Sequence, residues 1–392
     1  MSRAAPPVAV IHLALAIGGF AIGTTEFATM SLLPFFARDL GISATTAGHA
    51  ISAYALGVVM GAPAIAVLAA KLSRRVLLVA LMLLFAAGNA LSGVAGTYEQ
   101  MLAFRFVAGL PHGAYFGIAM LVAAELMPDG KRAQGVARVF LGLTVATIVG
   151  VPLANGMGQA VGWRSVFALV AVLALFTAAL VWWLAPRDVP DADASPLREL
   201  GALARPQVWL TLATGAIGFG GLFAVYTYLA DTMLAVTLTS PAAIPLALAA
   251  FGVGMTGANL IVPRFADRAL LPTAAGVLVW SIAALLLWPL AATHLWSVCV
   301  GMLAIGVGGA LGTVLQTRLM DVAGDAQALA AALNHSAFNL ANALGPWLGG
   351  MAIAGGFGWT STGYVGAALA AGGLAVLGAS VLLDGSRRAV AA

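Results

Sequence analysis

One carboxylate stands in the first long apolar stretch of the chain. Glu26 is the only ionisable residue between His12 and Arg38. An acid in hydrocarbon is costly, about 2.5–3.5 kcal/mol for Asp on insertion scales, so it needs a compensating partner, a water-filled cavity or a proton. Each of these settings is typical of transport, and Glu26 is therefore a candidate proton-coupling residue.

A buried arginine at a similar depth is a second candidate for proton coupling. Arg105 lies six residues into the apolar stretch 99–127, about 9 Å from its start at 1.5 Å per residue. The orientation derived below puts that start at the outer surface, and Glu26 also falls in the outer half of its stretch. Approach of Arg105 favours the ionised carboxylate and burial without it favours the protonated acid. We hypothesise that alternation between these environments couples protons to transport, although the sequence alone does not establish contact.

Other polar residues inside apolar stretches are candidates for substrate contact, because such side chains tend to face the interior of a helix bundle. A lone histidine or tyrosine more often packs or lies at the membrane interface, so this alternative stays open. Asp231 is left undecided as a second proton site. The candidate substrate-binding residues are His112, Tyr226, Tyr228, Asn334, His335, Asn339 and Asn342.

The composition explains why these residues stand out. Of 392 residues 62% are hydrophobic and 8% are charged, whereas a soluble domain has about 25% charged residues. A soluble globule is excluded. Cys299 is the single cysteine and has no cysteine partner for a disulfide or a metal site. The net charge of +4 comes from basic residues in short loops, which indicates orientation in a membrane and not a nucleic-acid partner.

The pattern of apolar runs predicts an all-α integral membrane protein with two groups of six transmembrane helices. Residues 1–185 form the first group, 186–206 a polar cytoplasmic linker, and 207–392 the second group. The predicted spans are 9–36, 46–70, 76–95, 99–127, 134–159, 164–185, 207–235, 241–265, 272–291, 295–318, 328–354 and 360–383.

The distribution of basic residues favours an orientation with both termini in the cytoplasm. In that orientation only Arg38, Arg105 and Arg164 of the 18 basic residues fall away from the cytoplasmic side, as the positive-inside rule requires. The halves also resemble each other at an offset near 197, since residues 57–75 align with residues 254–272 and Arg105 maps to Met302. Such a parallel repeat is typical of rocking two-bundle transporters with a site near the midplane.

Several motifs carry a resemblance to a known family. They include Gly23-Thr24-Thr25-Glu26-Phe27 with Leu32-Leu33-Pro34, Tyr54-Ala55-Leu56-Gly57 to Gly61-Ala62-Pro63, Arg105 to Gly113, and Gly142-Leu143-Thr144-Val145-Ala146 to Gly150-Val151-Pro152. Over essentially the whole chain the sequence resembles the major facilitator superfamily. The match is to its twelve-span drug:proton antiporters, in the bacterial sugar-efflux, chloramphenicol-efflux and purine-ribonucleoside-efflux branch. The resemblance implies that Arg105 takes part in proton transfer.

The loop after the second span looks like the superfamily's gating motif. Ala66 and Ala70 replace the usual glycine and acid, while the basic residues remain. The alternative is that these basic residues only set the topology. Glu125 and Asp129, at the inner end of the fourth span, are possible partners for the basic loop. The candidate gating residues are Lys71, Arg74, Arg75, Glu125, Asp267 and Arg268.

The fifth span partly matches the antiporter motif, and a related stretch occurs in the eleventh. Glycine permits close helix approach and proline bends a helix, although both are common in membrane helices for packing alone. Val151 and Asn155 replace two usual glycines. The candidate helix-packing residues are Gly142, Gly150, Pro152, Gly156, Gly345 and Pro346.

The repeat, the orientation and Glu26 favour a coupled carrier. The resemblance implies that this carrier is a proton-coupled efflux transporter of small organic molecules such as drugs or sugars, in the bacterial cytoplasmic membrane. We expect a monomer that uses no cofactor or metal and is driven by the proton gradient. A purine nucleoside or metabolite exporter of the same fold is the alternative. An enzyme is not expected because the sequence has no His-Glu-x-x-His or Gly-x-Ser-x-Gly pattern. A channel fits an isolated buried acid in two similar bundles less well than a carrier does.

Overall fold

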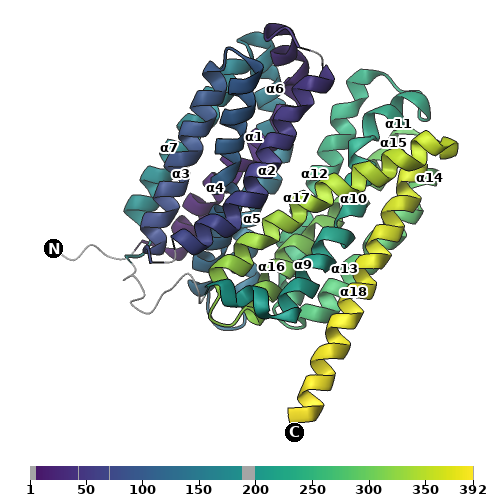
Figure 1. Cartoon of the computed structure of the whole chain (residues 1–392). Helices are drawn as coiled ribbons and strands as arrows, with labels where there is room; N and C mark the ends of the chain where they lie inside the picture. Colours follow the sequence, from purple (N-terminus) through teal and green to yellow (C-terminus); the bar gives the residue numbers. More distant parts are fainter. Residues whose placement is uncertain (1–5, 43, 70, 188–198, 392) are drawn as a thin grey trace. The chain divides into compact units, whose positions relative to one another are not determined.

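The structure is a computed structural model that describes residues 6–42, 44–69, 71–187 and 199–391. Within these ranges the chain is helical and contains no strand (Figure 1), so the all-α class is confirmed. Ten of the described helices are long and apolar enough to cross a membrane, and Leu270–Leu286 is a shorter apolar helix. The remaining predicted span is covered by a helix from Gln327 to Ala352.

Each predicted span in the first half corresponds to described helix. The fifth span is divided in two by a π-helical turn, η1. The elements are α1 (Val8–Asp39), α2 (Ala44–Leu68), α3 (Arg74–Val94), α4 (Tyr98–Glu125), α5 (Arg132–Val145), η1 (Ala146–Gly150), α6 (Val151–Ala160) and α7 (Trp163–Leu184). Side-chain caps start two of them, because Ser73 Oγ accepts from the Val76 amide and Thr97 Oγ1 from the Gln100 amide.

The second half contains more breaks than the apolar pattern predicted. The seventh and tenth spans are each built from several short helices. The elements are η2 (Gly201–Ala204), α9 (Pro206–Gly218), α10 (Gly220–Thr227), α11 (Leu229–Ala235), η3 (Pro241–Ala243), α12 (Ile244–Ala266), α13 (Leu270–Leu286), α14 (Trp288–Ala291), α15 (Leu295–Val307), η4 (Gly308–Ala310), α16 (Leu311–Val322), α17 (Gln327–Ala352), η5 (Ile353–Phe357) and α18 (Ser361–Ala391).

A proline accounts for the break in the fifth span, and a glycine marks a close helix contact next to a break in the seventh. Pro152 has no N–H to donate to the helix ladder, and the turn just before it is π-helical. At Gly221 an added Cβ would lie 2.3 Å from the Gly366 carbonyl oxygen, so α10 approaches α18 as closely as backbones allow. Hydrophobicity alone does not reveal such irregularities, because the apolar run continues across them.

The chain divides into two compact units. Residues 1–202 and 325–336 form the first, and residues 203–324 and 337–392 form the second. The start of α17 thus belongs to the first unit, where an added Cβ at Gly117 of α4 would lie 2.7 Å from the Ala332 amide nitrogen. The predicted linker 186–206 lies partly outside the described residues, at 188–198. The predicted domain division therefore stays a prediction.

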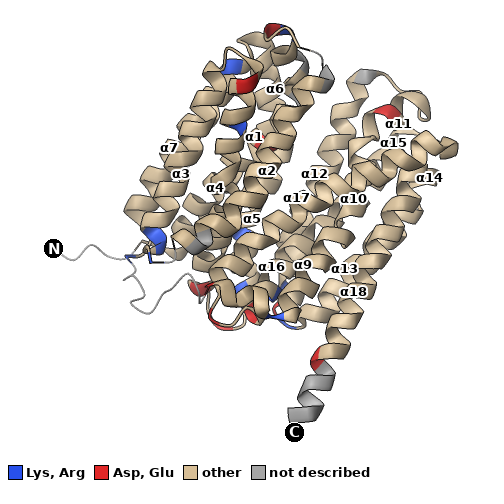
Figure 2. Ribbon diagram, in the orientation of Figure 1, with Lys and Arg blue, Asp and Glu red and all other residues tan. Residues whose placement is uncertain are grey.

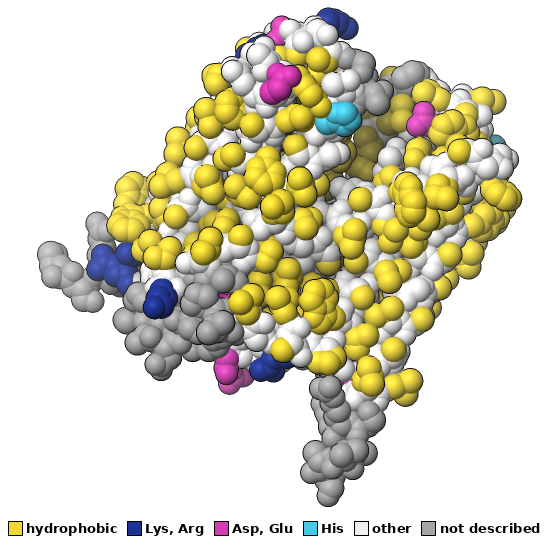
Figure 3. All heavy atoms as spheres, viewed as in Figure 1, with side chains coloured by type: hydrophobic (Ala, Val, Ile, Leu, Met, Phe, Trp, Pro, Cys, Tyr) yellow, Lys and Arg dark blue, Asp and Glu magenta, His cyan; other side chains and the backbone are white. Residues whose placement is uncertain are grey.

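Most of the charged residues lie near the helix ends in each unit, and the long flanks of the helices are mostly uncharged (Figure 2). Hydrophobic side chains cover those flanks in the space-filling view (Figure 3). Exposed large hydrophobic residues occur along both units, including Leu56, Phe176 and Ile261. Such surfaces suit lipid and not water.

The internal repeat appears in the structure as two equivalent glycine seams. An added Cβ at Gly57 would lie 2.3 Å from the Phe106 carbonyl oxygen, and one at Gly254 would lie 2.0 Å from that of Leu303. Both members of the second pair stand 197 positions after those of the first. The α2–α4 contact of the first unit is thus repeated as the α12–α15 contact of the second.

The predicted helix-packing residues differ in their surroundings. An added Cβ would lie 1.9 Å from the Ala16 carbonyl oxygen at Gly142, 2.2 Å from Thr24 Oγ1 at Gly150, and 2.1 Å from the Gly220 carbonyl oxygen at Gly345. At Gly156 it would meet no atom within 4 Å. Its role in helix packing therefore stays a prediction. Pro152 is the second residue of α6 and Pro346 lies inside α17.

We predict that Gly142→Ala destabilises the protein and Gly156→Ala does not. The methyl group at residue 142 would overlap a backbone carbonyl that cannot rotate away, and overpacking of this kind costs about 1–3 kcal/mol. Alanine at residue 156 has open space and a better helix propensity. Thermal unfolding of both variants in detergent measures the difference. Equal transition temperatures would contradict the proposed α1–α5 seam.

Candidate functional site

Arg105 is the centre of a polar group inside the first unit. Its side chain projects from α4 and is 1% exposed. Nη1 donates a hydrogen bond to Thr25 Oγ1 of α1 at 3.2 Å, and the guanidinium carbon lies 4.3 Å from the centre of the Tyr54 ring of α2. The second contact is a cation–π interaction, which is strongest where water is excluded. Arg105 thus joins three helices.

The hydroxyl of Thr25 is oriented by a hydrogen-bond chain. Asn89 of α3 donates from Nδ2 to the Phe85 carbonyl at 2.9 Å, so its Oδ1 is left to accept. Thr25 donates to that oxygen at 2.7 Å and so keeps its own lone pairs for Arg105. Both Asn89 and Thr25 are buried. The hydrogen bonds therefore run in one direction, because Arg105 can only donate to Thr25 and Thr25 donates in turn to Asn89.

Glu26 follows Thr25 in α1 and is partly accessible. Its carboxylate interacts electrostatically with Arg105 and with the Tyr54 hydroxyl. Within the described part of the chain no hydrogen bond or ion pair joins Glu26 directly to Arg105. The two residues predicted from depth are therefore neighbours in one site. The acid makes no direct ion pair with the arginine in the described structure.

The polar group continues from Tyr54 to two histidines. The Tyr54 hydroxyl and His112 Nδ1 are 2.9 Å apart and share a hydrogen bond. His112 is 1% exposed, and its Nε2 has no hydrogen-bond partner among the described residues. Its ring centre lies 5.2 Å from that of His335 in α17, and His335 stacks on Phe116 at 4.4 Å. Both predicted histidines thus meet in the first unit.

The remaining predicted substrate residues fall into both units. Asn334 is buried in the first unit, next to His335 in the chain. In the second unit, the Tyr226 ring lies 4.8 Å from that of Phe251, and the Tyr228 hydroxyl donates to the Pro346 carbonyl at 2.9 Å. Also in that unit, Asn339 is 8% exposed, Asn342 is half-buried and Asp231 of α11 is exposed.

An ion pair joins two of the predicted gating residues. Arg74, at the start of α3, pairs with Glu125, at the end of α4, and the Arg75 guanidinium carbon lies 4.7 Å from the Trp182 ring centre. Lys71 and Arg268 are exposed, and Asp267 is half-buried at the end of α12. Ala70 lies outside the described residues, as do the side chains of Ala66 and Pro34.

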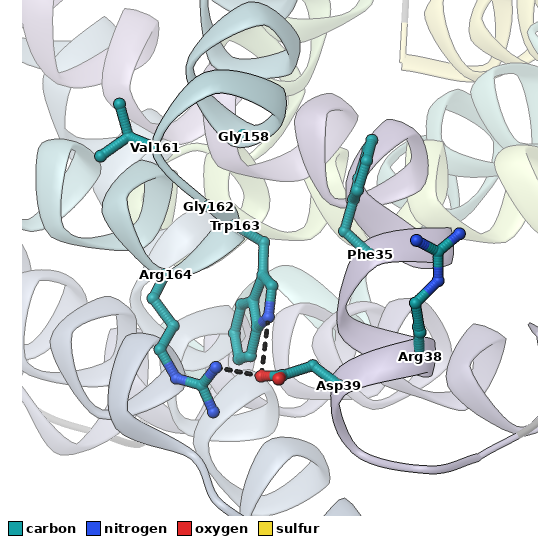
Figure 4. Close-up of a pocket in the computed structure, with 8 residues that line it drawn as sticks. All are labelled: Phe35, Arg38, Asp39, Gly158, Val161, Gly162, Trp163 and Arg164. Atoms are coloured by element: carbon teal, nitrogen blue, oxygen red, sulfur yellow. Dashed lines mark hydrogen bonds and ion pairs between the residues drawn. The ribbon is translucent and has the colours of Figure 1, made fainter.

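A charged cluster at the far end of α1 was not predicted from the sequence. Asp39 accepts hydrogen bonds from Arg164 and from Trp163 Nε1, the latter at 3.2 Å (Figure 4). These three residues line an open hollow of about 510 Å³ together with Phe35 and Arg38. The Arg164 and Trp163 bonds lower the pKa of the Asp39 carboxyl. This cluster ties the end of α1 to the start of α7.

The fold and the buried polar group define a class: a multi-pass helical membrane carrier in which a buried arginine, an acid and two histidines share one unit. A family model for the Major Facilitator Superfamily matches residues 15–269. The chain belongs to the Major Facilitator Superfamily, and its relatives are membrane transporters.

Individual relatives cover most of the chain. The inner membrane transport protein YdhP of Escherichia coli (strain K12) is 39% identical over 366 residues, which cover 93% of this chain and 94% of that protein. A chloramphenicol resistance protein of Streptomyces lividans is 34% identical over 341 residues, covering 85% and 86%. The crystal structure of the transporter FucP in the outward conformation matches with a TM-score of 0.76 at 15% identity, over 94% of this chain and 98% of that one. The structural match shows the shared fold.

The Asp39 cluster generates a pH-dependent prediction. Because the pKa of Asp39 is lowered in the folded protein, its ionised form stabilises the fold above the unfolded value of about 3.9. That contribution is lost as the pH falls through the lowered pKa. We expect Asp39→Asn to reduce the unfolding temperature at neutral pH, and the difference from the parent protein to shrink on acidification. Thermal unfolding from about pH 7 to about pH 3 measures it. A gap that stays constant over this range would contradict the assignment.

Proposed function

We propose that this protein is a proton-coupled efflux transporter of small organic molecules, such as drugs or sugars, that works by alternating access. The observation that carries the proposal is the neighbourhood of Glu26 and Arg105. An acid on α1 interacts with a buried arginine on α4, and within the described residues no direct bond joins the two. A permanent ion pair would hold the carboxylate ionised, whereas this arrangement lets it gain and lose a proton.

In the proposed cycle Glu26 takes a proton from the outside and releases it to the cytoplasm, and this exchange drives substrate outward. In one state Arg105 approaches the carboxylate and favours its ionised form. In the other state the apolar surroundings favour the neutral acid. Substrate and proton compete for the site, so binding of one promotes release of the other. The cytoplasmic membrane of a bacterium, with both termini in the cytoplasm and a monomeric protein, is the setting we propose. The proposed location in the cytoplasmic membrane is supported by the description of YdhP as an inner membrane transport protein.

The buried polar groups also support a substrate with hydrogen-bonding groups. His112 offers a ring nitrogen without a partner among the described residues, beside the aromatic rings of Tyr54 and Phe116. An amide- or hydroxyl-bearing molecule with an apolar body fits that chemistry. The description of one relative as a chloramphenicol resistance protein favours a drug. Export of purine nucleosides or other metabolites is the alternative, because these molecules carry the same groups.

We predict that Glu26→Gln abolishes accumulation driven by a proton gradient and retains exchange of substrate for substrate. Glutamine imitates the neutral acid but cannot release a proton. Uptake into inverted membrane vesicles with an imposed proton gradient measures the first activity, and counterflow without a gradient measures the second. The matched control is Glu99→Gln, which removes an exposed acid from the first turn of α4. The control is expected to behave like the parent protein.

The same vesicles, tested with chloramphenicol, arabinose and a purine ribonucleoside, distinguish the substrate classes. Full gradient-driven accumulation by Glu26→Gln would overturn the role of this carboxylate. Ohmic currents without saturable exchange would overturn the carrier itself and favour a channel.

A further inference from the structure

Tyr54 touches the two ends of the polar group with different parts of its side chain. Its ring centre lies 4.3 Å from the Arg105 guanidinium carbon, and its hydroxyl shares a 2.9 Å hydrogen bond with His112 Nδ1. The side chain is 3% exposed. Arg105 and His112 are seven residues apart on α4, so Tyr54 spans two turns of that helix from α2.

The backbone of Tyr54 also lies in close contact with α4. An added Cβ at Gly109 of α4 would lie 2.2 Å from the Tyr54 carbonyl oxygen. Together with the contact between Gly57 and Phe106 described above, this approach holds α2 against α4 at the tyrosine and one turn after it. The backbone from which the ring projects is therefore held close to α4, where the ring lies against Arg105.

The second unit contains the same seam without the polar groups. At an offset of 197, Phe251 replaces Tyr54, and an added Cβ at Gly306 would lie 2.3 Å from the Phe251 carbonyl oxygen. At the same offset Met302 stands for Arg105 and Gly309 for His112. A phenyl ring is thus sufficient for this helix packing. The hydroxyl of Tyr54 is an addition that occurs together with the arginine and the histidine.

The hydrogen bond with Tyr54 determines what His112 offers at its other nitrogen. If the phenol donates to Nδ1, neutral His112 carries its proton on Nε2 and presents a donor. If Nδ1–H donates to the phenol oxygen, Nε2 presents a lone pair. Nε2 is buried and has no partner among the described residues, so a bound molecule is a natural partner for it. Loss of the Tyr54 hydroxyl would therefore change whether Nε2 of His112 is a donor or an acceptor.

We propose that Tyr54 is a positioning residue that couples the proton site at Glu26 and Arg105 to a substrate site at His112. This role rests on the proposed function of proton-coupled efflux. The titratable and charged groups around Tyr54 are Glu26 of α1, Arg105 and His112 of α4, and His335 of α17, which reaches it through His112. When the charge on Glu26 changes, the electrostatic field at Arg105 and at the tyrosine ring changes with it. The hydrogen bond with the Tyr54 hydroxyl then alters the charge distribution on His112.

The test compares two tyrosine-to-phenylalanine variants. Tyr54→Phe keeps the ring against Arg105 and removes only the hydroxyl, and the seam at Phe251 shows that phenylalanine suits such a position. Tyr115→Phe is the matched control. Tyr115 is also buried in the first unit and donates one hydrogen bond, at 2.9 Å to the Leu15 carbonyl. Each variant loses one buried hydroxyl, so a general loss of stability affects both.

The measurement is equilibrium binding of a probe to purified protein at about pH 6 and about pH 8, with counterflow as a check of folding. The probe is whichever of chloramphenicol, arabinose or a purine ribonucleoside the parent protein transports. We expect the affinity of the parent protein and of Tyr115→Phe to change at least about fivefold between the two pH values, the lower end of ordinary coupling between sites. The change for Tyr54→Phe is expected to be less than about twofold, with counterflow retained.

Three results overturn the proposal in distinguishable ways. A parent protein that transports none of the probes, or binds its probe equally at both pH values, removes the proposed proton-coupled efflux and with it any coupling role. A parent protein with the expected pH dependence, matched by an equal dependence in Tyr54→Phe, leaves the function standing and removes only the role of Tyr54. Loss of counterflow in Tyr54→Phe but not in Tyr115→Phe also counts against it, since the hydroxyl would then be needed for the fold or the binding site itself.

Discussion

The buried guanidinium of Arg105 is the constraint on which the rest of the first unit depends. A charge that is 1% exposed inside an apolar helix bundle is tolerated only with partners around it. Those partners come from different helices: the oriented hydroxyl of Thr25 on α1 and the ring of Tyr54 on α2. Glu26 adds charge nearby without a direct bond among the described residues. The arginine thus links α1, α2 and α4, and the proposed function adds that the nearby acid changes its protonation.

Close helix contact through glycine makes this arrangement rigid. The α2–α4 seam brings backbones together around Tyr54, and the same seam recurs between α12 and α15 of the second unit. The repeat supplies a comparison within one chain, since Phe251 occupies the place of Tyr54. Packing is shared by the two halves, whereas the chemistry of arginine and histidine at these positions is confined to the first. We therefore regard the seam as the scaffold and the polar group as the added function.

The sequence predicted the parts of this site that depend on depth and on chemical cost. Glu26, Arg105 and the two histidines were recognisable because polar residues are rare in apolar runs, and the spans followed from hydrophobicity. Thr25, Asn89 and Tyr54 were missed as site residues, since their roles depend on helix rotation and on which helices pair. Asn89 had a usable signal as an amide inside an apolar stretch. The Asp39 cluster and the open surroundings of Gly156 likewise required three-dimensional contacts that no spacing rule contains.

In the proposed function, one acid exchanges its proton for substrate next to a buried arginine. Infrared difference spectroscopy of the purified protein in lipid tests this claim directly, because it observes the carboxyl group itself. We predict that addition of a transported compound removes the C=O stretching band of a protonated carboxyl, and that the band change is absent from Glu26→Gln. An unchanged carboxyl region in the parent protein, or the same band change in Glu26→Gln, would contradict the account.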